Sequence, residues 1–151
     1  MKKRNRRAFS LVEVTLALGI AAFCLIAVFG LMPVGVQTNR NATSQTAATS
    51  ILSDVIADMR ATPKTTSIST QYGIAFSTNS TTTLYFDGQG QFATSLGANS
   101  RYRLTVTIPT NPAGPNSATF ADLKVTWPAA VDPTTTTPGG SSEMFAAFDR
   151  N

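Results

Sequence analysis

The chain has 151 residues, with 12 lysines and arginines, 8 acidic residues, no histidine and one cysteine. This composition excludes a histidine base, an internal disulfide and a cysteine-rich zinc site. Five of the basic residues lie within the first seven positions, so residues 9–151 carry a net charge of 7 − 8 = −1. The body of the protein lacks the positive charge of a nucleic-acid-binding domain. We therefore expect a protein that is not an enzyme and that has no cofactor, no metal and no nucleic-acid partner.

The N-terminal segment is typical of a membrane-spanning helix. A basic cluster at residues 2–7 precedes the stretch from Val14 to Val36, in which no residue is charged. At 1.5 Å per residue, this stretch makes roughly 35 Å of helix, enough to cross a hydrocarbon core of about 30 Å. Because the basic residues lie only on the N-terminal side, the positive-inside rule predicts a cytoplasmic N-terminus and an extracytoplasmic body.

Glu13 lies at the start of this apolar stretch. A carboxylate inside lipid costs about 2.5–3.5 kcal/mol, so such a residue predicts a function. The alternative interpretation places Glu13 in the headgroup region, one turn from the basic cluster, where its charge costs little.

Residues 8–13 read AFSLVE, after a short basic leader and before about 20 apolar residues. This string resembles the prepilin (class III) signal of type IV pilins and pseudopilins. The resemblance implies that a membrane aspartyl peptidase cuts between Ala8 and Phe9 and that the new amino group of Phe9 is methylated. It also implies that Glu13 meets the terminal ammonium of a neighbouring subunit during assembly. Ala8 stands where the family usually has glycine, which implies slower cleavage.

The resemblance further implies a minor pilin or pseudopilin, a structural subunit of a type IV pilus or a type II secretion-like fibre. The sequence EVTLAL from Glu13 onward is similar to the minor branches of the family. The overall layout resembles the verrucomicrobial pilin-like proteins of the Verru_Chthon type. The implied partners are the prepilin peptidase/methyltransferase, other subunits, an inner-membrane platform protein, an assembly ATPase and the lipid bilayer. The implied location is single-pass in the inner membrane, with the head in the periplasm or on an extracellular fibre.

The apolar helix is expected to continue beyond the membrane. Pro33 would kink it, since proline removes an intrahelical hydrogen bond. Apolar residues then recur at three- and four-residue steps from Ala48 to Met59, and Pro63 ends the helix after Ala61. The predicted segments are a leader (1–8), a transmembrane helix (9–36), an extracytoplasmic continuation (37–61) and a head (62–151). The alternative is two helices joined by a loop at 37–41.

The head alternates between apolar and polar residues, which predicts strands. We expect four of them, at residues 69–77, 82–87, 101–108 and 118–127, with a turn at Asp87-Gly88 and a loop at residues 109–115. An antiparallel sheet of these strands would pack on the amphipathic part of the helix. The predicted fold class is therefore α+β, with the layout of a type IV pilin.

The C-terminal region starts with a Thr/Pro/Gly-rich stretch that predicts a loop at residues 132–142. Met144, Phe145 and Phe148 follow at short helical spacing, and we expect them to cap the sheet edge or to contact a partner. Asp132 and Glu143 are too few to predict a calcium site and are interpreted as solvated turn residues.

Arg101, Arg103 and Lys124 form a small group of cations in the predicted sheet. Such a group would touch DNA in an uptake pilus or form an ordinary solvated sheet face, and we favour the second interpretation. The rival to a pilin is a single-pass, signal-anchored binding module that does not polymerise. Glu13 separates the two, because a simple anchor does not need its carboxylate.

Overall fold

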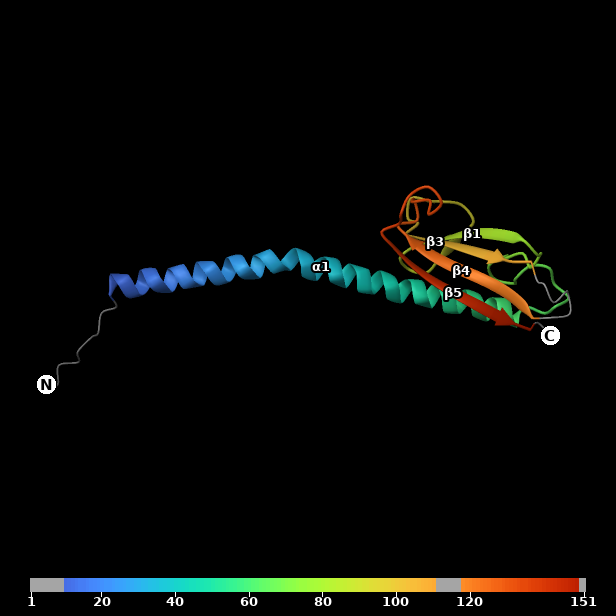
Figure 1. Ribbon diagram of the computed structural model, residues 1–151, viewed down its shortest axis with the longest axis horizontal. Coiled ribbons are helices and arrows are strands. Elements are labelled where there is room, and N and C mark those ends of the chain that lie inside the picture. The colour runs from blue at the N-terminus through green and yellow to red at the C-terminus, as the bar shows by residue number, and fades with distance from the viewer. Residues whose placement is uncertain (1–9, 111–117, 150–151) are drawn as a thin grey trace. The chain divides into compact units, whose positions relative to one another are not determined.

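The computed structural model describes residues 10–110 and 118–149, and the chain divides into two compact units at Arg40 and Asn41. The elements follow in the order α1, β1, β2, β3, β4 and β5 (Figure 1). Their bounds are Leu11–Ala61 for α1, Ser80–Phe86 for β1, Phe92–Ala93 for β2, Tyr102–Ile108 for β3, Thr119–Trp127 for β4 and Gly140–Phe148 for β5. One long N-terminal helix followed by an antiparallel sheet confirms the predicted α+β class.

The part of α1 in the first unit is apolar and uncovered. Every large apolar side chain from Leu11 to Val36 is exposed, and Pro33 lies inside the helix. By length and composition, α1 is a candidate membrane span, although an N-terminal signal sequence has the same properties. The kink predicted at Pro33 stays a prediction.

The part of α1 in the second unit carries one buried face. The predicted apolar stripe is confirmed, and the helix ends at Ala61 as expected. The buried helix residues are Ser44, Ala48, Ile51, Leu52, Val55, Ile56 and Met59. The alternative of a loop at 37–41 is wrong, because these residues are helical. Asparagine and threonine lower helix propensity by less than about 1 kcal/mol each, which is too little to break a helix alone.

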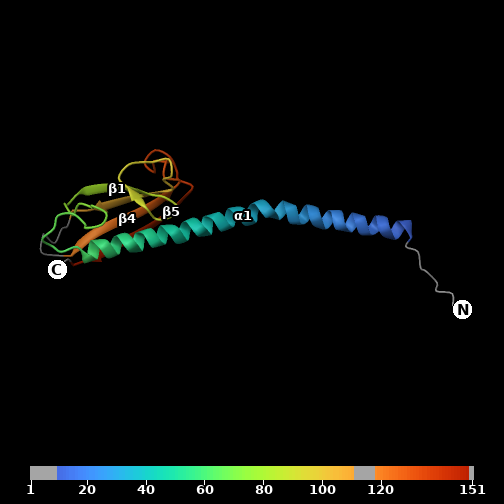
Figure 2. The same ribbon diagram turned by 180° about the vertical axis from the view of Figure 1, so that it is seen from behind.

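The five strands form one antiparallel sheet in the order β2-β1-β3-β4-β5. One face of the sheet packs on α1, and the helix lies on the same side of the strands in both views (Figures 1 and 2). The alternation predicted for residues 102–108 is confirmed, with Tyr102, Leu104, Val106 and Ile108 all buried. The other buried apolar residues of the sheet are Leu84, Phe86, Ala121, Leu123, Val125, Ala146 and Phe148. The core of the head is thus a single layer between helix and sheet.

The strand predicted at residues 69–77 is wrong. This segment is a turn-rich connection, with only an isolated bridge between Ile68 and Ala75. The carboxylate of Asp58 accepts the backbone N–H groups of Gln71 and Tyr72 at 3.0 and 3.2 Å, which holds the connection against the helix. Gly73 has a φ of 65°, a left-handed conformation that a continuous strand does not contain.

The interpretation of the C-terminal region also needs correction. Residues 140–148 form β5, which pairs with β4 along its whole length, so Met144, Phe145 and Phe148 lie on a strand rather than at helical spacing. The predicted loop at 132–142 ends earlier, because β5 begins at Gly140. With β2 and β5 added and 69–77 removed, the described residues hold five strands instead of four.

Gly140 pairs with Trp127 at the point where the chain re-enters the sheet. A Cβ atom at position 140 would collide with the indole ring of Trp127, so the ring occupies the space that a side chain would need. Trp127 packs partly against the core and makes an edge-to-face contact with Tyr102, with 6.2 Å between ring centroids. The peptide bond from Trp127 to Pro128 is cis.

Candidate functional site

Glu13 lies in the first turn of α1. The carbonyl oxygen of Ser10 accepts the N–H groups of Glu13 and Val14 at 3.0 and 3.2 Å, so Ser10 starts the helix. Glu13 is exposed and is the one charged residue between Arg7 and Arg40. The predicted cleavage and methylation positions, Ala8 and Phe9, lie outside the described residues.

The helix itself offers Glu13 only a small electrostatic gain. An acidic side chain in the first turn interacts favourably with the helix dipole by about 0.3–1 kcal/mol. Placing the same charge in lipid costs about 2.5–3.5 kcal/mol on a lenient scale. If α1 spans a membrane with Glu13 at hydrocarbon depth, the carboxylate therefore needs a cation from outside the helix.

Asp132 and Glu143, the two acids weighed for a calcium site, each lie beside a cation. Within residues 10–110 and 118–149, no group of three or more potential metal ligands occurs. Asp132 forms an ion pair with Arg103 at 3.3 Å, and Glu143 forms one with Lys124 at 3.1 Å. Both acids therefore have their own cationic partner.

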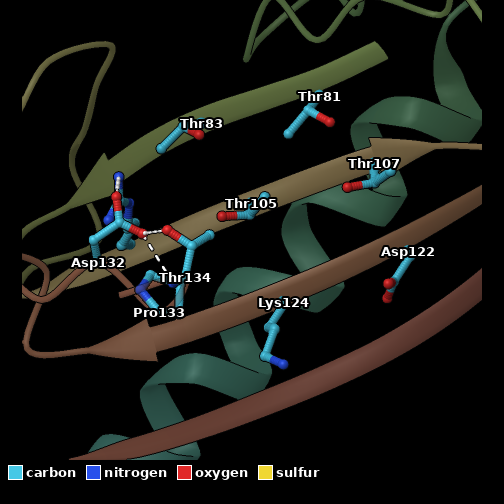
Figure 3. Close-up of a pocket in the computed structure, with 10 residues that line it drawn as sticks. Thr81, Thr83, Thr105, Thr107, Asp122, Lys124, Asp132, Pro133 and Thr134 are labelled. Carbon is cyan, nitrogen blue, oxygen red and sulfur yellow. Dashed lines mark hydrogen bonds and ion pairs between the residues drawn. The ribbon is translucent and has the colours of Figure 1, made fainter. Parts of the chain in front are cut away.

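The face of the sheet that points away from α1 carries a groove of about 340 Å³ (Figure 3). Its centre consists of four threonines from two paired strands, in which Thr81 lies opposite Thr107 and Thr83 lies opposite Thr105. The other lining residues are Arg103, Asp122, Lys124, Asp132, Pro133 and Thr134. Sequence analysis missed this groove. The available signal was the T-x-T pattern in each of two strands, which places both threonines of a pattern on one face.

A short loop closes one end of the groove. Asp132 accepts the N–H and the hydroxyl of Thr134 at 3.0 and 2.7 Å. Arg103 donates to Asp132 and to the carbonyl oxygen of Val131, both at 3.3 Å, and its guanidinium lies 5.8 Å from the ring centroid of Tyr85. The N–H of Thr134, its hydroxyl and the charge of Arg103 lower the pKa of Asp132. The loop is thus fixed to the sheet by a charged and hydrogen-bonded contact.

Two of the three cations in the predicted group meet at the groove. Arg103 and Lys124 both line the groove, whereas Arg101 lies outside it. Each of the two groove cations is paired with an acid. The lining residues of the groove therefore carry no excess of positive charge.

Replacing Asp122 by asparagine is expected to stabilise the head at pH 7. Burial and the nearby charge of Glu143 raise the pKa of Asp122 above its ordinary 3.8, against an opposing effect of Lys124. The folded state therefore binds this proton more tightly than the unfolded state, so ionised Asp122 lowers stability at neutral pH. This cost disappears as the pH falls through the folded pKa to the unfolded one.

The measurement is thermal unfolding of the full chain, followed by the fluorescence of Trp127, its single tryptophan. Asp122→Asn should raise the midpoint at pH 7 and leave it unchanged at pH 3. Asp54→Asn, which neutralises an exposed carboxylate on α1, serves as the control for lost charge. An equal gain at both pH values, or a loss at pH 7, would contradict the assignment.

No family model, curated protein or solved structure matches the chain. Two features of the chain itself bear on its function. These features are Glu13 on the exposed apolar helix and the threonine groove on the sheet.

Proposed function

We propose that the protein is a minor pilin or pseudopilin, a structural subunit of a type IV pilus or a type II secretion-like fibre. The observation that carries the proposal is Glu13, a single charge in the first turn of an exposed apolar helix, within the string AFSLVE. The α+β head, with a long helix under one face of an antiparallel sheet, supports the pilin-like assignment.

The chemistry of assembly follows from charge in a medium of low polarity. An α-amino group and a glutamate carboxylate are ordinarily both charged at neutral pH. Within lipid, each is costly alone and acceptable when paired. The methylated amino group of Phe9 in one subunit would thus meet Glu13 of its neighbour, and this pairing would set the offset between adjacent helices.

The proposal includes the partners and the location. The prepilin peptidase/methyltransferase would process the chain at Ala8 and Phe9, and a platform protein driven by an assembly ATPase would move it into the fibre. Extraction of an apolar helix from the bilayer requires that other subunits' helices replace the lipid. The chain would cross the inner membrane once, with its head in the periplasm or on the fibre, and would have no catalytic activity.

A second candidate is a single-pass, signal-anchored binding module that does not polymerise. The observation that favours it is the groove on the open face of the sheet, which offers a binding site without any fibre. In this function, α1 would act only as an anchor, and the charge of Glu13 would have no assembly partner.

The N-terminal residue and intact mass of the chain purified from its own membrane test the proposal. We expect a chain that starts at Phe9 and carries one added methyl group. Ala8→Gly should keep this product and Ala8→Arg should abolish it, because the peptidase pocket takes a small residue before the cut. A wild-type chain that still starts at Met1 or Lys2 would overturn the pilin proposal and favour the anchored module.

A further inference from the structure

The threonine groove presents hydroxyl groups that the protein does not use. Within the part of the chain that the structure describes, the hydroxyls of Thr81, Thr83, Thr105 and Thr107 make no hydrogen bond to another protein group (Figure 3). Each hydroxyl donates one hydrogen bond and accepts two. The four together therefore form a compact array that matches a ligand with several hydroxyl groups of its own.

The charges of the groove favour a neutral ligand. Its two cations are each engaged, Arg103 with Asp132 and Lys124 with Glu143. Asp122 adds a further carboxylate among the lining residues. An anion would meet at least as much negative as positive charge, whereas a neutral polyhydroxylated molecule would find both donors and acceptors.

Aromatic rings flank the groove on the same face of the sheet. Phe145 lies directly opposite Asp122, is 64% exposed and stacks on Phe120 with 5.9 Å between ring centroids. Tyr85 lies opposite Arg103, beyond the other side of the groove. A sugar ring has hydroxyls at its edge and apolar C–H groups on its faces. A hydroxyl-rich lining beside the exposed ring of Phe145 matches both parts of such a molecule.

The size and openness of the groove suit a short stretch of a longer chain. Its volume of about 340 Å³ lies near the lower end of ligand sites, which span roughly 300–1,000 Å³. The lining side chains lie on one face of the sheet, with α1 behind it (Figure 3). The groove therefore has room for a small part of a polymer whose remainder would extend along the surface.

We propose that the outer face of the sheet binds a neutral glycan, with the hydroxyls of the four threonines in contact with the hydroxyls of the sugar. Asp122 and Lys124 add polar contacts along β4, and Phe145 provides a surface for an apolar sugar face. This inference goes beyond the proposed function and does not depend on it, because an anchored module and a fibre subunit would present the same groove.

The test uses the full chain in phosphatidylcholine nanodiscs, since a sugar-based detergent would compete for the groove. The neutral trisaccharides cellotriose and triacetylchitotriose are titrated while binding is followed by saturation-transfer NMR. We expect saturable binding of at least one trisaccharide below about 10 mM. Thr83→Val and Thr105→Val should each weaken it by roughly 3- to 10-fold, because valine keeps the shape but removes a hydrogen bond.

Thr82→Val is the matched control, since Thr82 lies between two groove residues but alternates to the opposite face of β1. It should leave binding unchanged, and thermal unfolding of all variants verifies that they fold. The proposal is overturned if neither trisaccharide binds or if Thr82→Val weakens binding as much as Thr83→Val. Salt-sensitive binding of heparin, without binding of the neutral trisaccharides, would also overturn it by showing an anion site.

Discussion

Replacing Glu13 by glutamine is expected to leave the chain in the membrane and to keep it out of the fibre. Glutamine has nearly the same shape but no charge, so the terminal ammonium of a neighbouring subunit would lose its counter-ion in lipid. A cost of about 2.5–3.5 kcal/mol for an unpaired charge corresponds to on the order of 100-fold less incorporation. The measurement is the amount of the chain in sheared and sedimented fibres, relative to the amount left in the membrane.

Asp54→Asn is the matched control for the loss of one carboxylate, because Asp54 lies exposed in the part of α1 that belongs to the head unit. It should enter fibres like the wild type. A Glu13→Gln chain that assembles normally would show that the carboxylate has no assembly role. Its position would then be explained by the small dipole contribution of the first helical turn alone.

Replacing Leu52 by alanine is expected to destabilise the head by about 3 kcal/mol, within the 2–5 kcal/mol usual for such truncations. Leu52 is fully buried on the face of α1 that packs on the sheet. The cavity would lie in the one layer of core that the head possesses. Because a typical domain is stable by only about 5–15 kcal/mol, a large share of its stability would be lost.

The measurement is urea unfolding of the full chain in nanodiscs, followed by the fluorescence of Trp127, which packs partly against the same core. Ser53→Ala is the control, since Ser53 is the next residue along α1 and is exposed. It should change the midpoint little. If Leu52→Ala unfolds at the wild-type urea concentration, the packing between this helix face and the sheet is not what stabilises the head.

The elements that could be predicted from the sequence are those in which buried and exposed residues alternate with a simple period, because one face packs on a single partner. β3 alternates without exception from Tyr102 to Ile108 because one face packs on α1 and the other is the open face of the sheet. The buried stripe of α1 was predictable for the same reason, since its residues face a single partner. In both cases the period of burial is the period of the backbone, so the pattern can be read without the structure.

Two segments were misassigned because their pattern of apolar residues does not match their secondary structure. Tyr72 and Ile74 alternate and are buried, but their backbone N–H groups bond to the side chains of Asp58 and Ser69 in a turn and do not pair with a neighbouring strand. β5 shows the reverse case, because Phe145 is exposed while Ala146 is buried. Its strand conformation comes from pairing with β4, which is encoded by residues about 20 positions earlier.

The two candidate sites also differ in whether a local sequence pattern reveals them. Glu13 could be selected from sequence because its signal, a charge within an apolar run, is local. The groove combines side chains from β1, β3, β4 and the loop around Asp132. Which threonines meet depends on the pairing of Thr81 with Thr107, and no local pattern specifies that pairing.

The indole of Trp127 over Gly140 limits where the chain can rejoin the sheet after the Thr/Pro-rich loop. A shift of β5 by one residue would expose its core-facing side chains. In one direction the shift would also place Ser141 against the ring, whereas in the other direction Gly139 would take that place. The ring therefore requires glycine at position 140, and the burial of Ala146 and Phe148 aligns the last strand. The loop before β5 can gain or lose residues while Ala146 and Phe148 keep their places in the core. A change in loop length therefore leaves the packing of the head intact.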